Sequence, residues 1–226
     1  MEKPLVVEDM GDGQIPTSVK TLRKSCRDDG IVLTILDELV LILHVLMLEM
    51  SFFPVDNQDE IEGHEFNYNR VMKLSKRMPD RWKQKNDQYI LVYVLKPASD
   101  YPCTLVMTRS SEDLLVNLHA ANIDNVNFSI VLDSCAYIVP SLKCTIRYQY
   151  MKMLSYRFKS CIAYPTKANI LQYCGITYPS IENLPVEVIM YLIQKHLDKR
   201  SILNLGKTCW TFWQICGCSK LRKSNS

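Results

Sequence analysis

The sequence predicts an α+β protein in which a buried helix comes first, an antiparallel sheet follows and further helices come last. The segment 34–50 is strongly apolar yet contains several charged residues, a pattern typical of a helix inside a protein core. Short runs rich in β-branched and aromatic residues then succeed one another between 89 and 139. Because parallel strands need a long crossover connection, this close spacing favours an antiparallel sheet.

Residues 1–29 are predicted to form a polar, flexible lead. Gly11, Asp12 and Gly13 give a turn signal, and Pro16 interrupts regular structure. The lead contains no apolar stretch of the kind found in a secretory signal peptide. Together with nine cysteines, an odd number, this indicates reduced thiols and a cytoplasmic or nuclear location.

The apolar segment 31–50 is long enough to raise the question of a membrane span. It contains Asp37, Glu38, His44 and Glu49, and charged groups are costly in the middle of a bilayer. We therefore interpret the segment as a buried helix and expect no membrane association. A histidine on such a helix is most simply a core residue with a hydrogen-bond partner.

The remaining elements follow from periodicity and from proline and glycine positions. A short helix is expected near 68–77, before Pro79. The strand-like runs cover 89–95, 104–108, 114–120, 128–132 and 136–139. Helical periodicity then covers 142–162, and Pro165 is suited to start a further helix that ends near Gly175.

The last quarter of the chain has the pattern of short amphipathic helices. Pro185 suits the first turn of a helix, where its missing N–H breaks no bond, and Glu187 complements the helix dipole. The apolar stripes of the three helices are Val188, Leu192 and Ile193, then Ile202, Leu203 and Leu205, then Cys209, Phe212 and Trp213. Such stripes pack on one another or on a preceding domain, or they dock a partner. A segment this short builds only a small core, which favours docking.

In their order, the residues of this tail resemble an F-box. The resemblance rests on Leu184-Pro185, Glu187-Val188-Ile189, Leu197-Asp198, Ser201-Ile202-Leu203, Cys209 and Phe212. It implies a docking module whose helices enter the apolar groove of a Skp adaptor, which in turn joins a cullin scaffold. It assigns adaptor binding to Leu184, Pro185, Val188, Leu192, Leu197, Leu203 and Phe212.

The preceding part of the chain resembles the FP domain, which certain F-box proteins share with a proteasome inhibitor. The matching residues are 39–49, Phe53-Pro54, Met78-Pro79, Trp82-Lys83, Leu115-Val116-Asn117, 154–159 and Tyr164-Pro165. The resemblance implies a dimerisation or partner-binding domain over 30–178, followed by the F-box over 179–226. It leaves open a homodimer or a heterodimer with the proteasome-inhibitor protein, and the candidate contact residues are His44, Met47, Leu115 and Val116.

Charge and motif content argue against several other functions. The net charge is only +3 and the basic residues are scattered, whereas a nucleic-acid-binding protein needs a basic stripe. The sequence lacks phosphate-binding glycine motifs and the H-E-x-x-H motif, and its cysteines and histidines lack paired zinc-ligand spacing. We therefore expect no catalytic residue, no metal and no cofactor.

These observations predict the substrate-recognition subunit of an SCF-type ubiquitin ligase. Such a subunit performs no chemistry and acts by bringing a substrate close to the catalytic subunits. The alternative is a dimerising scaffold that regulates the proteasome and carries a degenerate F-box. The residues 221–223 favour this alternative, because the third helix of an F-box commonly ends there in Leu-Trp.

Overall fold

The computed structural model describes residues 7, 13–56, 68–96, 98–140, 146–176, 181, 184–208, 212–213 and 215–216. The chain divides into two compact units, Met1–Cys174 and Gly175–Ser226. The predicted boundary between domains lies at 178, outside the described residues, as does the proposed hinge at Tyr178-Pro179-Ser180.

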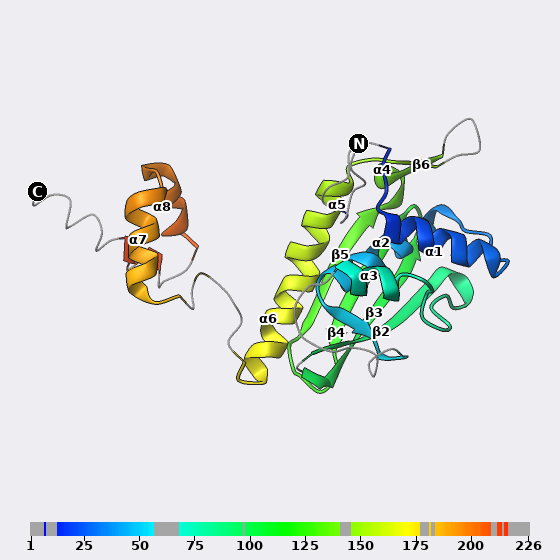
Figure 1. Ribbon diagram of the computed structural model, residues 1–226, viewed down its shortest axis with the longest axis horizontal. Helices are drawn as coiled ribbons and strands as arrows, with labels where there is room; N and C mark the ends of the chain where they lie inside the picture. The colour runs from blue at the N-terminus through cyan, green and yellow to red at the C-terminus, as the bar shows by residue number, and fades with distance from the viewer. Residues whose placement is uncertain are drawn as a thin grey trace, which may run out of the picture. The chain divides into compact units, whose positions relative to one another are not determined.

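The first unit is built on an antiparallel five-stranded sheet, and the predicted α+β class is confirmed. Its strands are β1 (Phe52–Pro54), β2 (Gln88–Leu95), β3 (Ala98–Ser110), β4 (Asp113–Ala120) and β5 (Asn127–Asp133). They lie side by side in chain order, as expected for a meander (Figure 1). The short strand β1 was not predicted, and Pro54 is tolerated there because β1 is an edge strand.

The helices that precede the sheet are α1 (Thr17–Asp28), α2 (Ile35–Glu49) and α3 (Tyr68–Leu74). The prediction of a flexible lead over 1–29 is wrong for α1, which packs against α2. Val19, Leu22 and Cys26 recur at helical spacing and are buried. Pro16 stands at the N-cap of α1, so it starts this helix and does not interrupt regular structure.

After the sheet come α4 (Ser134–Tyr137), β6 (Ile138–Pro140), β7 (Ile146–Tyr148), α5 (Met151–Phe158), a π-helical turn (Lys159–Ala163) and α6 (Tyr164–Tyr173). The helix predicted over 142–162 therefore begins too early, because Ile146–Tyr148 pairs with β6. The strand predicted over 136–139 is partly the helical turn α4. Pro165 lacks an N–H for the helical ladder, and the π-turn directly before it accommodates this break.

Helix α2 forms the centre of the first unit, and the charged residues along its length are paired. Asp37 binds the Lys83 ammonium at 2.8 Å, and Glu38 binds the Arg23 guanidinium at 2.8 Å. Glu49 binds the Lys159 ammonium at 2.9 Å. These contacts explain how an apolar helix can keep its carboxylates inside a core. No helix among the described residues is long and apolar enough to cross a membrane.

His44 is a core histidine. Its Nδ1 lies 2.8 Å from the Tyr93 hydroxyl, and both side chains are fully buried. Burial lowers the pKa of His44 to about 3, so the imidazole is neutral at ordinary pH.

Candidate functional site

The second unit contains a small helical bundle. Its elements are α7 (Val186–His196), α8 (Lys199–Leu205) and the helical residues 212–213 and 215–216. A core cluster joins them, made of Ile189, Ile193, Phe212 and Cys216. The half-buried apolar residues Leu197, Ile202, Leu205 and Ile215 pack around this cluster.

Local chemistry sets where these helices begin and end. Pro185 is the N-cap of α7, Glu187 lies in the first turn, and Lys195 and His196 lie in the last turn, which suits the helix dipole at both ends. Asp198 is the N-cap of α8, and its carboxylate accepts a bond of 2.7 Å from the backbone N–H of Ser201. This bond lowers the pKa of Asp198. The helix α8 ends at Leu205, with Gly206 as its C-cap.

Several large apolar side chains of the bundle are exposed. Leu184 is 39% exposed, Val188 42% and Leu203 50%, and Pro185 is exposed beside them. Val186 and Tyr191 are exposed as well, at 49% and 57%. Sequence reasoning missed these last two, although both lie within the apolar stretch of α7. Large apolar side chains gathered on one small unit are typical of a docking surface.

The other predicted adaptor-binding residues that the structure describes are buried or half-buried. Phe212 is 2% exposed, so it holds the bundle together and cannot contact a partner directly. Leu197 packs around the core, and Leu192 is half-buried. The predictions for Cys209 and for the end of the third helix at 221–223 fall outside the described residues.

Three of the four candidate contact residues of the first unit are buried. His44, Met47 and Val116 have no exposed surface, so their assignment to a partner surface is wrong. The reason is geometric: α2 packs on several elements at once, and Val116 lies on the inward face of β4. Leu115, which alternates with Val116, is 43% exposed on the outer face of the sheet.

The outer face of the sheet carries exposed apolar side chains between polar ones such as Thr108 and Asn117. Leu115 pairs with Val131 across β4 and β5, and Val131 is also exposed. Val92 of β2 is exposed on the same face, and Ile90 and Val106 are half-exposed. Helix α6 and the π-helical turn before it lie on the opposite face, next to strands β4 and β5 (Figure 1). Within the described residues, no group of histidine, cysteine and carboxylate side chains could hold a metal ion.

The comparison with protein families assigns the chain to a family of proteasome regulators. The chain matches the family described as the PI31 proteasome regulator N-terminal domain over residues 33–199, and it is a member of that family. This is the FP domain that the resemblance of the sequence predicted. The matched region includes α7 and so extends into the second unit.

Two individual relatives share about a quarter of their aligned residues with this chain. The chain is 26% identical over 216 residues to F-box only protein 7 of Rattus norvegicus, and 26% identical over 221 residues to F-box only protein 7 of Homo sapiens. Each comparison covers 92% of this chain but only 37% of the relative. The chain therefore spans little more than a third of the length of these proteins.

Proposed function

We propose that this protein is a non-catalytic adaptor subunit of a cullin-type ubiquitin ligase, in which the helical bundle binds a Skp adaptor as an F-box. The observation that carries the proposal is the exposure of the apolar residues Leu184, Pro185, Val188 and Leu203. These are four of the seven residues that the F-box resemblance assigned to adaptor binding. The similarity to F-box only protein 7 supports the same reading.

The proposed interface follows the common mode in which helices enter an apolar groove. The bundle keeps a small core of its own, so the exposed residues are free to contact a partner without unfolding the helices. Binding a substrate elsewhere on the chain would raise its effective concentration near the ligase's catalytic subunits. No side chain of this protein takes part in the chemical step in this proposal.

The double substitution of Leu184→Ala and Pro185→Ala is expected to weaken Skp-adaptor binding by about 2 kcal/mol or more, because a few central anchors dominate interface energies. This corresponds to roughly 30-fold in Kd. Calorimetry with purified adaptor measures the change. Val131→Ala, an exposed apolar truncation in the first unit, is the control and should leave adaptor binding unchanged. Equal affinity of the double variant and the wild type would contradict the F-box assignment.

We also propose that the outer face of the sheet binds a second FP domain, either in a homodimer or in a proteasome-inhibitor-type partner. The exposed pair of Leu115 and Val131 on neighbouring strands supports this part of the proposal. Apolar side chains on a sheet face are commonly covered by another layer, because exposing them to water costs free energy. The alternative function is a scaffold that regulates the proteasome without a ligase. It would bind its partner through the sheet face, and its helical bundle would bind no Skp adaptor.

Replacing Leu115 with aspartate is expected to convert any homodimer to monomer and to abolish binding of the inhibitor-type partner, because it places a charge next to Val131, where the partner would bury it. Sedimentation of the full chain, alone and with the purified partner, gives the measurement. The double variant of Leu184 and Pro185 serves as the control and should associate normally. A wild-type chain that stays monomeric and ignores the partner would argue against the sheet as an interface.

A further inference from the structure

We propose that a groove at the C-terminal end of α1 binds an extended peptide segment of a partner protein, with an acidic side chain next to an apolar one. The groove lies within the unit Met1–Cys174. It shares no residue with the bundle surface or with the outer face of the sheet, so this inference does not depend on the proposed function.

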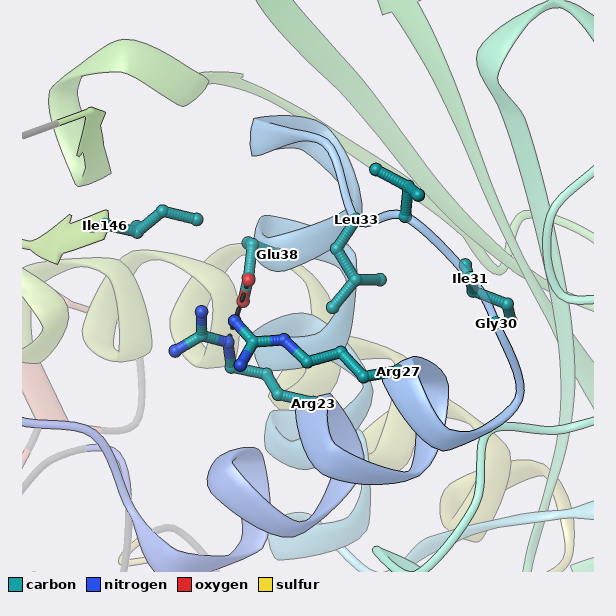
Figure 2. Close-up of a pocket in the computed structure, with 8 residues that line it drawn as sticks. Arg23, Arg27, Gly30, Ile31, Leu33, Glu38 and Ile146 are labelled. Carbon is teal, nitrogen blue, oxygen red and sulfur yellow. Dashed lines mark ion pairs between the residues drawn. The ribbon is translucent and has the colours of Figure 1, made fainter. Parts of the chain in front are cut away.

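The acidic side chain would enter the first of three adjoining hollows. This hollow has a volume of about 720 Å³, and Arg23 and Arg27, one turn apart on α1, point their guanidinium groups toward Glu38 inside it (Figure 2). Leu33 and Ile146 supply apolar lining. A volume of this size is within the range of ligand-binding pockets.

Glu38, the carboxylate among the described residues that line the hollow, already has two partners. One oxygen of Glu38 binds Arg23 Nε at 2.8 Å, and the other accepts a bond of 2.9 Å from the Tyr148 hydroxyl. Arg23 also lies over the Tyr148 ring, 5.7 Å from its centre. Arg23 is therefore held in place by two contacts and is neutralised by Glu38.

Arg27 is the cation that remains available. Its side chain is exposed, and it has no ion-pair partner among the residues that the structure describes. Burial raises the pKa of Glu38. The positive charges of Arg23 and Arg27 lower that pKa, so both arginines interact electrostatically with the carboxylate. Among the described residues that line the hollow, two guanidinium groups face one carboxylate, which leaves one positive charge that an incoming carboxylate would balance.

The apolar side chain would enter the second hollow. It has a volume of about 350 Å³ and shares Ile31 with the first, so the two adjoin. Pro79 and Trp82 line it, and Trp82 is stacked on Tyr89 with ring centres 5.8 Å apart. A buried ring fixed by a neighbour is a rigid wall, which limits the entropy lost on binding.

A third hollow extends the same groove. It has a volume of about 320 Å³ and shares Met78 and Pro79 with the second. The basic residues along all three are Arg23, Arg27, Lys73, Lys76, Arg77 and Arg81, whereas the acidic ones are Asp29, Glu38, Asp56 and Asp80. This balance favours an acidic occupant, and a row of small hollows suits the side chains of an extended peptide. The apolar lining disfavours a nucleic acid, which is recognised by continuous basic surface.

The test is a selection from a phage-displayed library of random peptides with the full chain as bait. The discriminating variant is Arg27→Glu, and the matched control is Lys24→Glu, which makes the same charge change on the exposed side of the same helix outside the groove. Thermal unfolding of the two variants should coincide, because neither side chain is buried. We expect wild type and the Lys24 variant to enrich peptides with aspartate or glutamate beside an apolar residue. Arg27→Glu should bind the enriched peptides about tenfold or more weakly.

Three results would overturn the proposal. The first is enrichment of no peptide, or of peptides without an acidic residue. The second is equal binding of the enriched peptides by Arg27→Glu and Lys24→Glu. The third is a wild-type homodimer that Arg27→Glu converts to monomer, which would show that a second copy fills the groove. Adaptor binding by the Arg27 variant should stay normal, so failure here is distinguishable from failure of the F-box assignment.

Discussion

Replacing Asp37 with alanine is expected to destabilise the first unit by about 3–5 kcal/mol, because it removes one partner of a buried ion pair. Asp37 has no exposed surface and accepts bonds from the Lys83 ammonium at 2.8 Å and the Tyr89 hydroxyl at 2.9 Å. It also completes the capping box of α2, where it accepts from the backbone N–H of Thr34 at 2.7 Å. Truncation would leave these donors without an acceptor at the start of the central helix.

Urea unfolding followed by circular dichroism measures this effect. The control is Asp80→Ala, which removes an ion pair of 3.3 Å with Arg77 on the surface. Because solvent screens that pair, its loss should cost less than about 1 kcal/mol. If the Asp37 and Asp80 variants unfolded at the same urea concentration, the buried network would not stabilise the fold as we infer.

Replacing Phe212 with alanine is expected to unfold the helical bundle while the first unit stays intact. Removing a buried phenylalanine costs about 3–5 kcal/mol, and this bundle has only a small core to lose it from. Phe212 packs with Ile189 and Ile193 of α7, so its loss detaches the third helical segment from the first. The apolar surface that we assign to adaptor binding would then lose its fixed arrangement.

Hydrogen exchange over residues 186–205 reports this change, and adaptor binding should fall with the loss of protection. Trp213→Ala is the matched control, since Trp213 is the next residue along the chain and is 58% exposed. It should reduce protection far less than Phe212→Ala. A Phe212 variant with wild-type protection would mean that the core cluster does not hold the bundle.

The central helix α2 shows which features the sequence predicts and which it does not. The apolar pattern over 34–50 predicted the helix, and the charged residues within it predicted burial in protein and not in lipid. The partners of those charges were not predictable. Tyr148 lies 110 residues from Glu38, and Lys83 lies 46 residues from Asp37. The spacing of residues along the chain does not show which distant residues pair, because the tertiary fold brings them together.

The helical bundle also has features that the sequence predicted and features that it did not. The local sequence predicted the start of α7 at Pro185, because a proline acts on the backbone of its own neighbours. It did not predict which apolar residues face outward. Phe212 was assigned to the adaptor and is core, whereas Val186 and Tyr191 were not assigned and are exposed.

The sequence by itself determined the fold class, the main strands and helices, the FP family and the position of a helical tail. These depend on periodicity, turn residues and motif order, which act over a few residues. Only the tertiary structure decided that α1 joins the core, that β1 and β7 form strands, and that His44, Met47 and Val116 are buried. Each of these depends on which distant segment covers the residue, because an apolar side chain is buried only when another element removes it from water.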